Sequence, residues 1–142
     1  MFVSGAVVHI TQCIFSGNKA TPAQATRLSR AYLGGAIYME TTTAEITTSV
    51  FNKNEVWSKQ GWHDGGAIFS QRGTLAILDS SFAGNQRSDG AGNHSVSVIT
   101  GKFALSNVTF GTWPGASMID KYNCGGQAYG YPVVPIMMHY VC

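Results

Sequence analysis

The chain has 142 residues, enough for one domain, and only 11% of them are charged, less than half the share of about 25% in typical soluble proteins. A hydrophobic share of 44% with a net charge of +2 excludes a disordered chain and gives no electrostatic reason to expect nucleic acid. No apolar run reaches the roughly 18 residues of a membrane helix, so we expect no membrane span.

The predicted strands lie in repeated segments. A partial copy, SGAVVHITQCIFSGN, opens the chain at Ser4, and GGAIYMETTTAEITTSVFNKN and GGAIFSQRGTLAILDSSFAGN follow from Gly34 and Gly65. The segment SVSVITGKFALSNVTF, which starts at Ser95, aligns with them without a gap. The phenylalanines that end the copies are 36, 31 and 28 residues apart, so the copies differ by insertions and not in their core segment. One structural unit is therefore repeated.

Equivalent positions of the copies form columns that alternate between apolar and polar residues, which indicates half-buried β-strands. A coil of about 30 residues cannot bury its own apolar face, so the copies are expected to stack. The sequence predicts an all-β fold, a right-handed parallel β-helix of about three to four coils over residues 1–112. Residues 113–142, with Pro132 and Pro135, are expected to form an irregular C-terminal cap.

Three columns are predicted to form ladders along the stack, one of aromatic rings, one of amides and one of aliphatic side chains. They comprise Phe15, Phe51, Phe82 and Phe110; Asn18, Asn54 and Asn85; and Ile10, Ile46, Ile77 and Leu105. The double glycines fit a corner that needs a positive φ or no side chain. The first copy lacks the Gly-Gly-Ala motif, so we expect it to lack the strand that follows that motif and to leave part of its core uncovered.

The repeated GGAI, with FSGN at Phe15, FNKN at Phe51 and FAGN at Phe82, resembles the chlamydial-type polymorphic outer membrane protein repeat. The resemblance extends from about Gly5 to Phe110. It implies a pectate-lyase-like parallel β-helix in a surface-exposed or secreted protein, with an adhesin-like or scaffold role and an extracellular or cell-surface location. The last copy departs from the pattern, with Asn93-His94-Ser95 in place of Gly-Gly-Ala.

Three insertions occur at the same corner of the repeat and are expected to project together from one edge. This candidate binding edge for a protein or a carbohydrate combines aromatic and cationic residues: Trp57, Trp62, His63, Arg27, Arg30 and Arg87. The alternative interpretation is that the tryptophans anchor the loops on the sheet.

No catalytic, metal or cofactor site is predicted. Polysaccharide-acting β-helix enzymes need clustered carboxylates, and the seven acidic residues share no column. Asp64 and Asp89, at neighbouring corners, form the best candidate pair for the alternative function, a pectate-lyase-like enzyme fragment or a carbohydrate-binding β-helix. A flat threonine grid is absent, because Arg72 and Gly73 lie under the run that begins at Thr41.

The ends of the chain carry two further expectations. The chain enters a strand a few residues after Met1 without a preceding cap, so a protein partner or further coils are expected at the Met1–Ile10 edge. Cys124 and Cys142 are candidates for a disulfide if the tail loops back in an oxidising compartment. Sequons begin at Asn93 and Asn107. The chain is therefore interpreted as a non-catalytic scaffold that belongs to a larger assembly.

Overall fold

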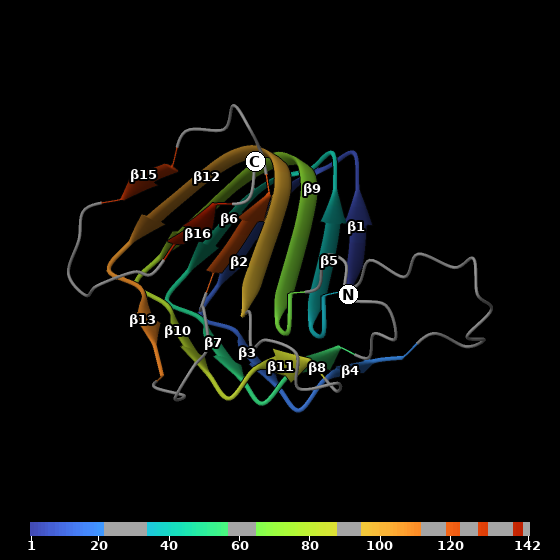
Figure 1. Ribbon diagram of the computed structural model, residues 1–142, viewed down its shortest axis with the longest axis vertical. Helices are drawn as coiled ribbons and strands as arrows, with labels where there is room; N and C mark the ends of the chain where they lie inside the picture. The colour runs from blue at the N-terminus through green and yellow to red at the C-terminus, as the bar shows by residue number, and fades with distance from the viewer. Residues whose placement is uncertain are drawn as a thin grey trace.

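The computed structural model describes residues 1–21, 34–56, 65–87 and 95–111, together with three short strands nearer the C-terminus. Within these parts the regular structure is entirely β-strand, and every strand pairing is parallel. Figure 1 shows neighbouring strands of each sheet side by side, from blue at the N-terminus to orange. The prediction of an all-β fold is confirmed.

The largest sheet has two halves that meet at a bend. One half contains β1 (Phe2–Ser4), β5 (Ile37–Glu40) and the first parts of β9 (Ile68–Leu78) and β12 (Val96–Ser106). The other half contains β2 (Val7–Thr11), β6 (Thr43–Thr47) and the second parts of β9 and β12. Since β9 and β12 run through the bend without interruption, they join the two halves into a single curled sheet (Figure 1).

Two smaller sheets follow in each repeat. One contains β3 (Ile14–Ser16), β7 (Val50–Asn52), β10 (Ser81–Ala83) and β13 (Thr109–Phe110). The other contains β4 (Lys19–Ala20), β8 (Glu55–Val56) and β11 (Gln86–Arg87). The last sheet was not predicted, because a strand of two residues carries too little alternation to be recognised from sequence.

The registers reproduce the columns that the sequence alignment gives. Ile10 pairs with Ile46, Ile46 with Ile77, and Ile77 with Leu105. The side chains of this column and of the column Val8, Ala44, Leu75 and Phe103 lie in one hydrophobic core. Parallel pairing in register therefore brings identical or similar apolar residues together, which is the unit of stabilisation in a sheet.

Left-handed backbone recurs at two corners of all four repeats and at a third corner of the first three. The first corner column consists of Gly5, Thr41, Arg72 and Thr100; the second of Gln12, Thr48, Asp79 and Asn107; the third of Gly17, Lys53 and Gly84. All of these residues have φ between 47° and 65°. Since most of them carry a side chain, the path of the chain at each corner is imposed by the stacked neighbours and not by glycine alone.

The double glycines have a different role from a positive φ. A Cβ on Gly34 would lie 1.7 Å from the carbonyl oxygen of Ile37, and one on Gly35 would lie 2.0 Å from that of Gly66. At the bend of the large sheet, a Cβ on Gly73 would lie 2.1 Å from the carbonyl oxygen of Thr42. These glycines are needed because neighbouring backbone approaches too closely for any side chain.

Two expectations about the ends differ from the structure. The first copy does have the strand that was expected to be missing: Phe2 of β1 pairs with Tyr38 of β5. Pairing needs only an extended backbone and the right alternation, and Val3 packs on the core without a preceding Gly-Gly-Ala. The tail is not wholly irregular either, because β14 (Ile119–Tyr122), β15 (Ala128–Gly130) and β16 (Met138–Tyr140) extend the large sheet in parallel.

Ile77→Asp is expected to unfold the protein. The Ile77 side chain is fully buried between Ile46 and Leu105, so an aspartate there would place an unpaired carboxylate in the core. Thr43→Asp, on an exposed outward position of β6, is the matched control. Circular dichroism and urea denaturation should show loss of cooperative unfolding for the first variant and a shift within about 1 kcal/mol for the second. Retention of a native transition by Ile77→Asp would contradict the core assignment.

Candidate interaction surface at the N-terminal end of the stack

The predicted phenylalanine column forms a continuous ring stack. Ring centroids are 4.8 Å apart for Phe15 and Phe51, 4.7 Å for Phe51 and Phe82, and 5.1 Å for Phe82 and Phe110. The rings of the first two pairs are parallel within 5°. Because the stack follows the strand spacing of about 4.8 Å, Phe51 and Phe82 are each held between two rings, whereas Phe15 at the N-terminal end stacks on one.

The asparagine column forms a directional ladder of amides. Asn54 Oδ1 accepts hydrogen bonds from the backbone N–H and from Nδ2 of Asn18, and Asn85 Oδ1 accepts the same pair from Asn54. Nδ2 of Asn54 also donates to the carbonyl of Phe15, and that of Asn85 to the carbonyl of Phe51. Each buried amide thereby forms hydrogen bonds through both its oxygen and its nitrogen, and it supplies partners to one N–H and one carbonyl of the preceding repeat.

A second polar ladder follows the column of small residues before the phenylalanine. The hydroxyl oxygen of Ser49 accepts from the N–H of Cys13 at 3.2 Å, and that of Ser80 accepts from the N–H of Ser49 at 3.0 Å. Each hydroxyl in turn donates to a carbonyl two residues earlier. Cys13, a free thiol that is half-buried, stands at the N-terminal end of this ladder.

The ring stack, the amide ladder and the hydroxyl ladder all end at the first repeat. There the outer edges of β1–β4 have no strand partner among the described residues. Phe15 and Val8 belong to the core, yet both are only half-buried. Asn18 is exposed, whereas Asn54 and Asn85 are buried. No donor among the described residues reaches the Oδ1 atom of Asn18, so the ladder stops with an acceptor open to the N-terminal side.

Large exposed apolar side chains also gather at this end. Among the described residues they are Met1, Phe2, Val7, Ile14 and, one repeat further, Val50. Val7 is 72% exposed and Ile14 is 76% exposed, and the two lie on different sheets. In the last repeat the same columns hold Lys102 and Thr109, which are polar. Among the residues whose side chains the structure describes, outward apolar surface is thus concentrated at the N-terminal end, which is typical of an interaction surface.

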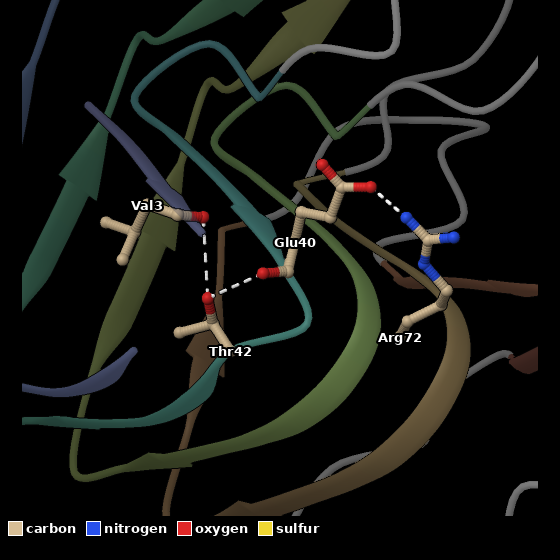
Figure 2. A network of polar contacts seen from close by, with 4 residues as sticks. All are labelled: Val3, Glu40, Thr42 and Arg72. Atoms are coloured by element: carbon tan, nitrogen blue, oxygen red, sulfur yellow. Dashed lines mark hydrogen bonds and ion pairs between the residues drawn. The ribbon is translucent and has the colours of Figure 1, made fainter. Parts of the chain in front are cut away.

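Charged groups near this end are paired across the strands. Lys19 of β4 forms an ion pair with Glu55 of β8 at 2.9 Å, and the lysine remains largely exposed. Figure 2 shows a second pair, between Glu40 at the end of β5 and Arg72 at the bend of β9. In the same view the hydroxyl of Thr42, at the bend between β5 and β6, donates to the carbonyl oxygen of Glu40 at 2.9 Å and lies 3.4 Å from that of Val3 in the first repeat.

An aromatic row lies on the outer side of the large sheet. The rings of Phe2 and Tyr38 stack with centroids 5.1 Å apart, and those of Tyr38 and Phe69 lie 5.4 Å apart. Burial raises the pKa of the Tyr38 hydroxyl, and the Glu40 carboxylate raises it further while Arg72 lowers it. Phe2, at the N-terminal end of this row, is 63% exposed, whereas Phe69 is fully buried.

The predicted binding edge lies outside the described residues. This holds for Trp57, Trp62, His63, Arg27 and Arg30, and for the candidate pairs Asp64 with Asp89 and Cys124 with Cys142. Only the backbone of Arg87 is described, where it pairs with Val56. These assignments remain predictions.

Nothing in the described parts of the chain suggests a metal site, because they contain no cluster of three or more His, Cys, Asp or Glu side chains. The described segments also contain no helix long and apolar enough to cross a membrane. Asn107, which begins one of the sequons, is exposed and donates through Nδ2 to Asp79 at 2.7 Å.

The stacked registers and ladders define a repeat protein built from parallel β-strands. Residues 12–40 match the family model of the Chlamydia polymorphic membrane protein repeat. The resemblance inferred from the GGAI and FxxN motifs is confirmed for this segment, and at a coarse level it indicates an outer-membrane or cell-surface setting. Neither curated proteins nor solved structures gave a significant match to the chain.

Sequence reasoning placed a partner at the Met1–Ile10 edge but missed several groups there. Ile14 was not singled out, although alternation in the strand places it outward beside the inward Phe15. The pairing of Lys19 with Glu55 was also missed, although both follow the asparagine of their repeat directly. Position relative to the motif was the signal that could have identified the ion pair.

Asn54→Ala is expected to lower the free energy of unfolding by about 2–4 kcal/mol. The change leaves the Phe15 carbonyl without its Nδ2 donor, removes one of the two donors of Asn85 Oδ1, and removes the acceptor of the Asn18 N–H and Nδ2. Asn18→Ala, at the exposed end of the same ladder, should cost about 1 kcal/mol or less, because water replaces the lost contacts there. Urea denaturation of both variants provides the comparison, and equal losses would show that the ladder is not cooperative.

Proposed function

We propose that the chain is a segment of a right-handed parallel β-helix that serves as a non-catalytic, adhesin-like scaffold at a cell surface. The repeat match over residues 12–40 supports the surface setting. The three successive parallel sheets per repeat, joined by short corners, support the β-helix. Right-handed winding is favoured because parallel crossover connections are right-handed in nearly all proteins.

The observation that carries the proposed scaffold role is the open N-terminal end. It combines unpaired strand edges with exposed apolar side chains at Phe2, Val7 and Ile14. Unprotected edges of this kind invite pairing with another segment, and proteins normally cover them. We therefore propose that the Met1–Ile10 edge and the neighbouring β3 engage a protein partner or further coils.

Association is expected to depend on this end. Size-exclusion chromatography with light scattering should show the purified chain self-associating or binding a partner, and Ile14→Asp should weaken that association at least tenfold. Thr109→Asp, in the same outward column of the last described repeat, is the control and should have no effect. A stable monomer whose first strands are fully protected from hydrogen exchange would falsify the proposed interaction.

We also propose that the chain has no polysaccharide lyase or hydrolase activity. The described residues contain no group of three or more His, Cys, Asp or Glu side chains that could hold calcium. An assay on polygalacturonate and common polysaccharides, with calcium present, should show no turnover. Activity that disappears in Asp64→Asn would favour the enzyme over the scaffold.

A further inference from the structure

The unmatched groups at the N-terminal end resemble one half of an internal junction between two repeats. Between the second and third repeats the junction consists of a ring stacked on a ring, an amide bonded to an amide, and paired strand edges. The N-terminal end offers the open face of Phe15, the unfilled Oδ1 of Asn18 and the free edge of β2. Each group lacks the counterpart that its equivalents have further along the stack.

The exposure of side chains shows how much a neighbouring repeat covers. Ile14 and Val50 occupy the same outward column, and Val50 has a repeat on both sides. Ile14 is 76% exposed and Val50 is 39% exposed. A second flanking repeat therefore roughly halves the exposed fraction of an outward apolar side chain in this column, so one more coil would bring Ile14 to the exposure of an internal residue.

The charge of Lys19 indicates which residue type a docking coil would carry beside it. Lys19 directly follows the asparagine of its repeat and pairs with Glu55, which directly follows the asparagine of the next repeat. A coil with a carboxylate at that position would place negative charge on both sides of the exposed lysine. A coil with a lysine there, like the first repeat itself, would place two ammonium groups about one strand spacing apart and repel.

We propose that the N-terminal end is a docking surface for one more coil of the same repeat type, whose FxxN motif is followed by a carboxylate. This inference rests on the proposed function and names its partner. The incoming coil supplies a phenylalanine ring for Phe15, an asparagine whose N–H and Nδ2 donate to Asn18 Oδ1, and an acidic side chain for Lys19. The β1 to β4 edges then receive the same parallel pairing that they give to β5 to β8.

The test grafts this chain's own second coil onto the full protein. A copy of residues 34–67 is joined directly before Met1, so that Met1 takes the place that Ile68 has after Ala67. The graft should raise the melting temperature by about 5 °C or more and protect amides of β1–β4 from hydrogen exchange. Any self-association that remains should no longer respond to Ile14→Asp, because the grafted coil and not β3 then forms the open end.

Two control grafts separate docking from mere extension of the chain. The first carries Phe51→Ser and Asn54→Ala in the copy only, and it should lose most of the gain in melting temperature. The second carries Glu55→Lys in the copy. It should lose part of the gain in melting temperature, and its difference from the unmodified graft should shrink at high salt.

Three outcomes overturn the proposal: a graft that leaves the melting temperature and amide protection unchanged, a graft that stays unfolded, and equal gains from the graft and the first control. If the ungrafted chain nevertheless associates through Ile14, the scaffold function stands and the partner has a chemistry other than this repeat. If it does not associate either, the proposed function fails as well.

Discussion

Everything in this molecule depends on keeping successive repeats in register, and the buried asparagine ladder is the interaction that enforces it. Each amide donates to the carbonyl of a phenylalanine in the preceding repeat and accepts from the asparagine of that repeat. A shift by one residue would leave both groups buried without partners, at a cost of about 1–3 kcal/mol for each. The ring stack, the aliphatic columns and the corners all assume the register that the ladder fixes.

Much of this arrangement could be predicted from sequence because residues that touch are chemically alike. Ile46 and Ile77, or Phe51 and Phe82, are partners in space and equivalents in the alignment. Prediction from sequence fails where the backbone conformation, and not the type of side chain, determines the structure. Strand β1 has no motif, β4 has two residues, and the left-handed corners at Thr41 and Thr100 are held by neighbours and not by their own preference.

The candidate interaction surface was only partly predictable for a related reason. A partner at the Met1–Ile10 edge could be expected from the alternation of the first strands, but the outward direction of Ile14 and the end of the amide ladder at Asn18 require the actual register. The direction of the ladder is also not predictable from residue type. Asn54 and Asn85 each accept a hydrogen bond at Oδ1 from the repeat on their N-terminal side, and this direction depends on the backbone geometry.

The corners with left-handed backbone have a consequence for how such a chain can change. In one corner column the residue is successively Gln12, Thr48, Asp79 and Asn107, while φ stays between 48° and 55°. The backbone there tolerates unrelated side chains at a conformational cost of roughly 1–2 kcal/mol each, which the stacked neighbours outweigh. Substitutions at these corners alter the outer chemistry and leave the core untouched. Residues at the exposed corners can therefore change in one repeat after another during evolution while the fold stays the same.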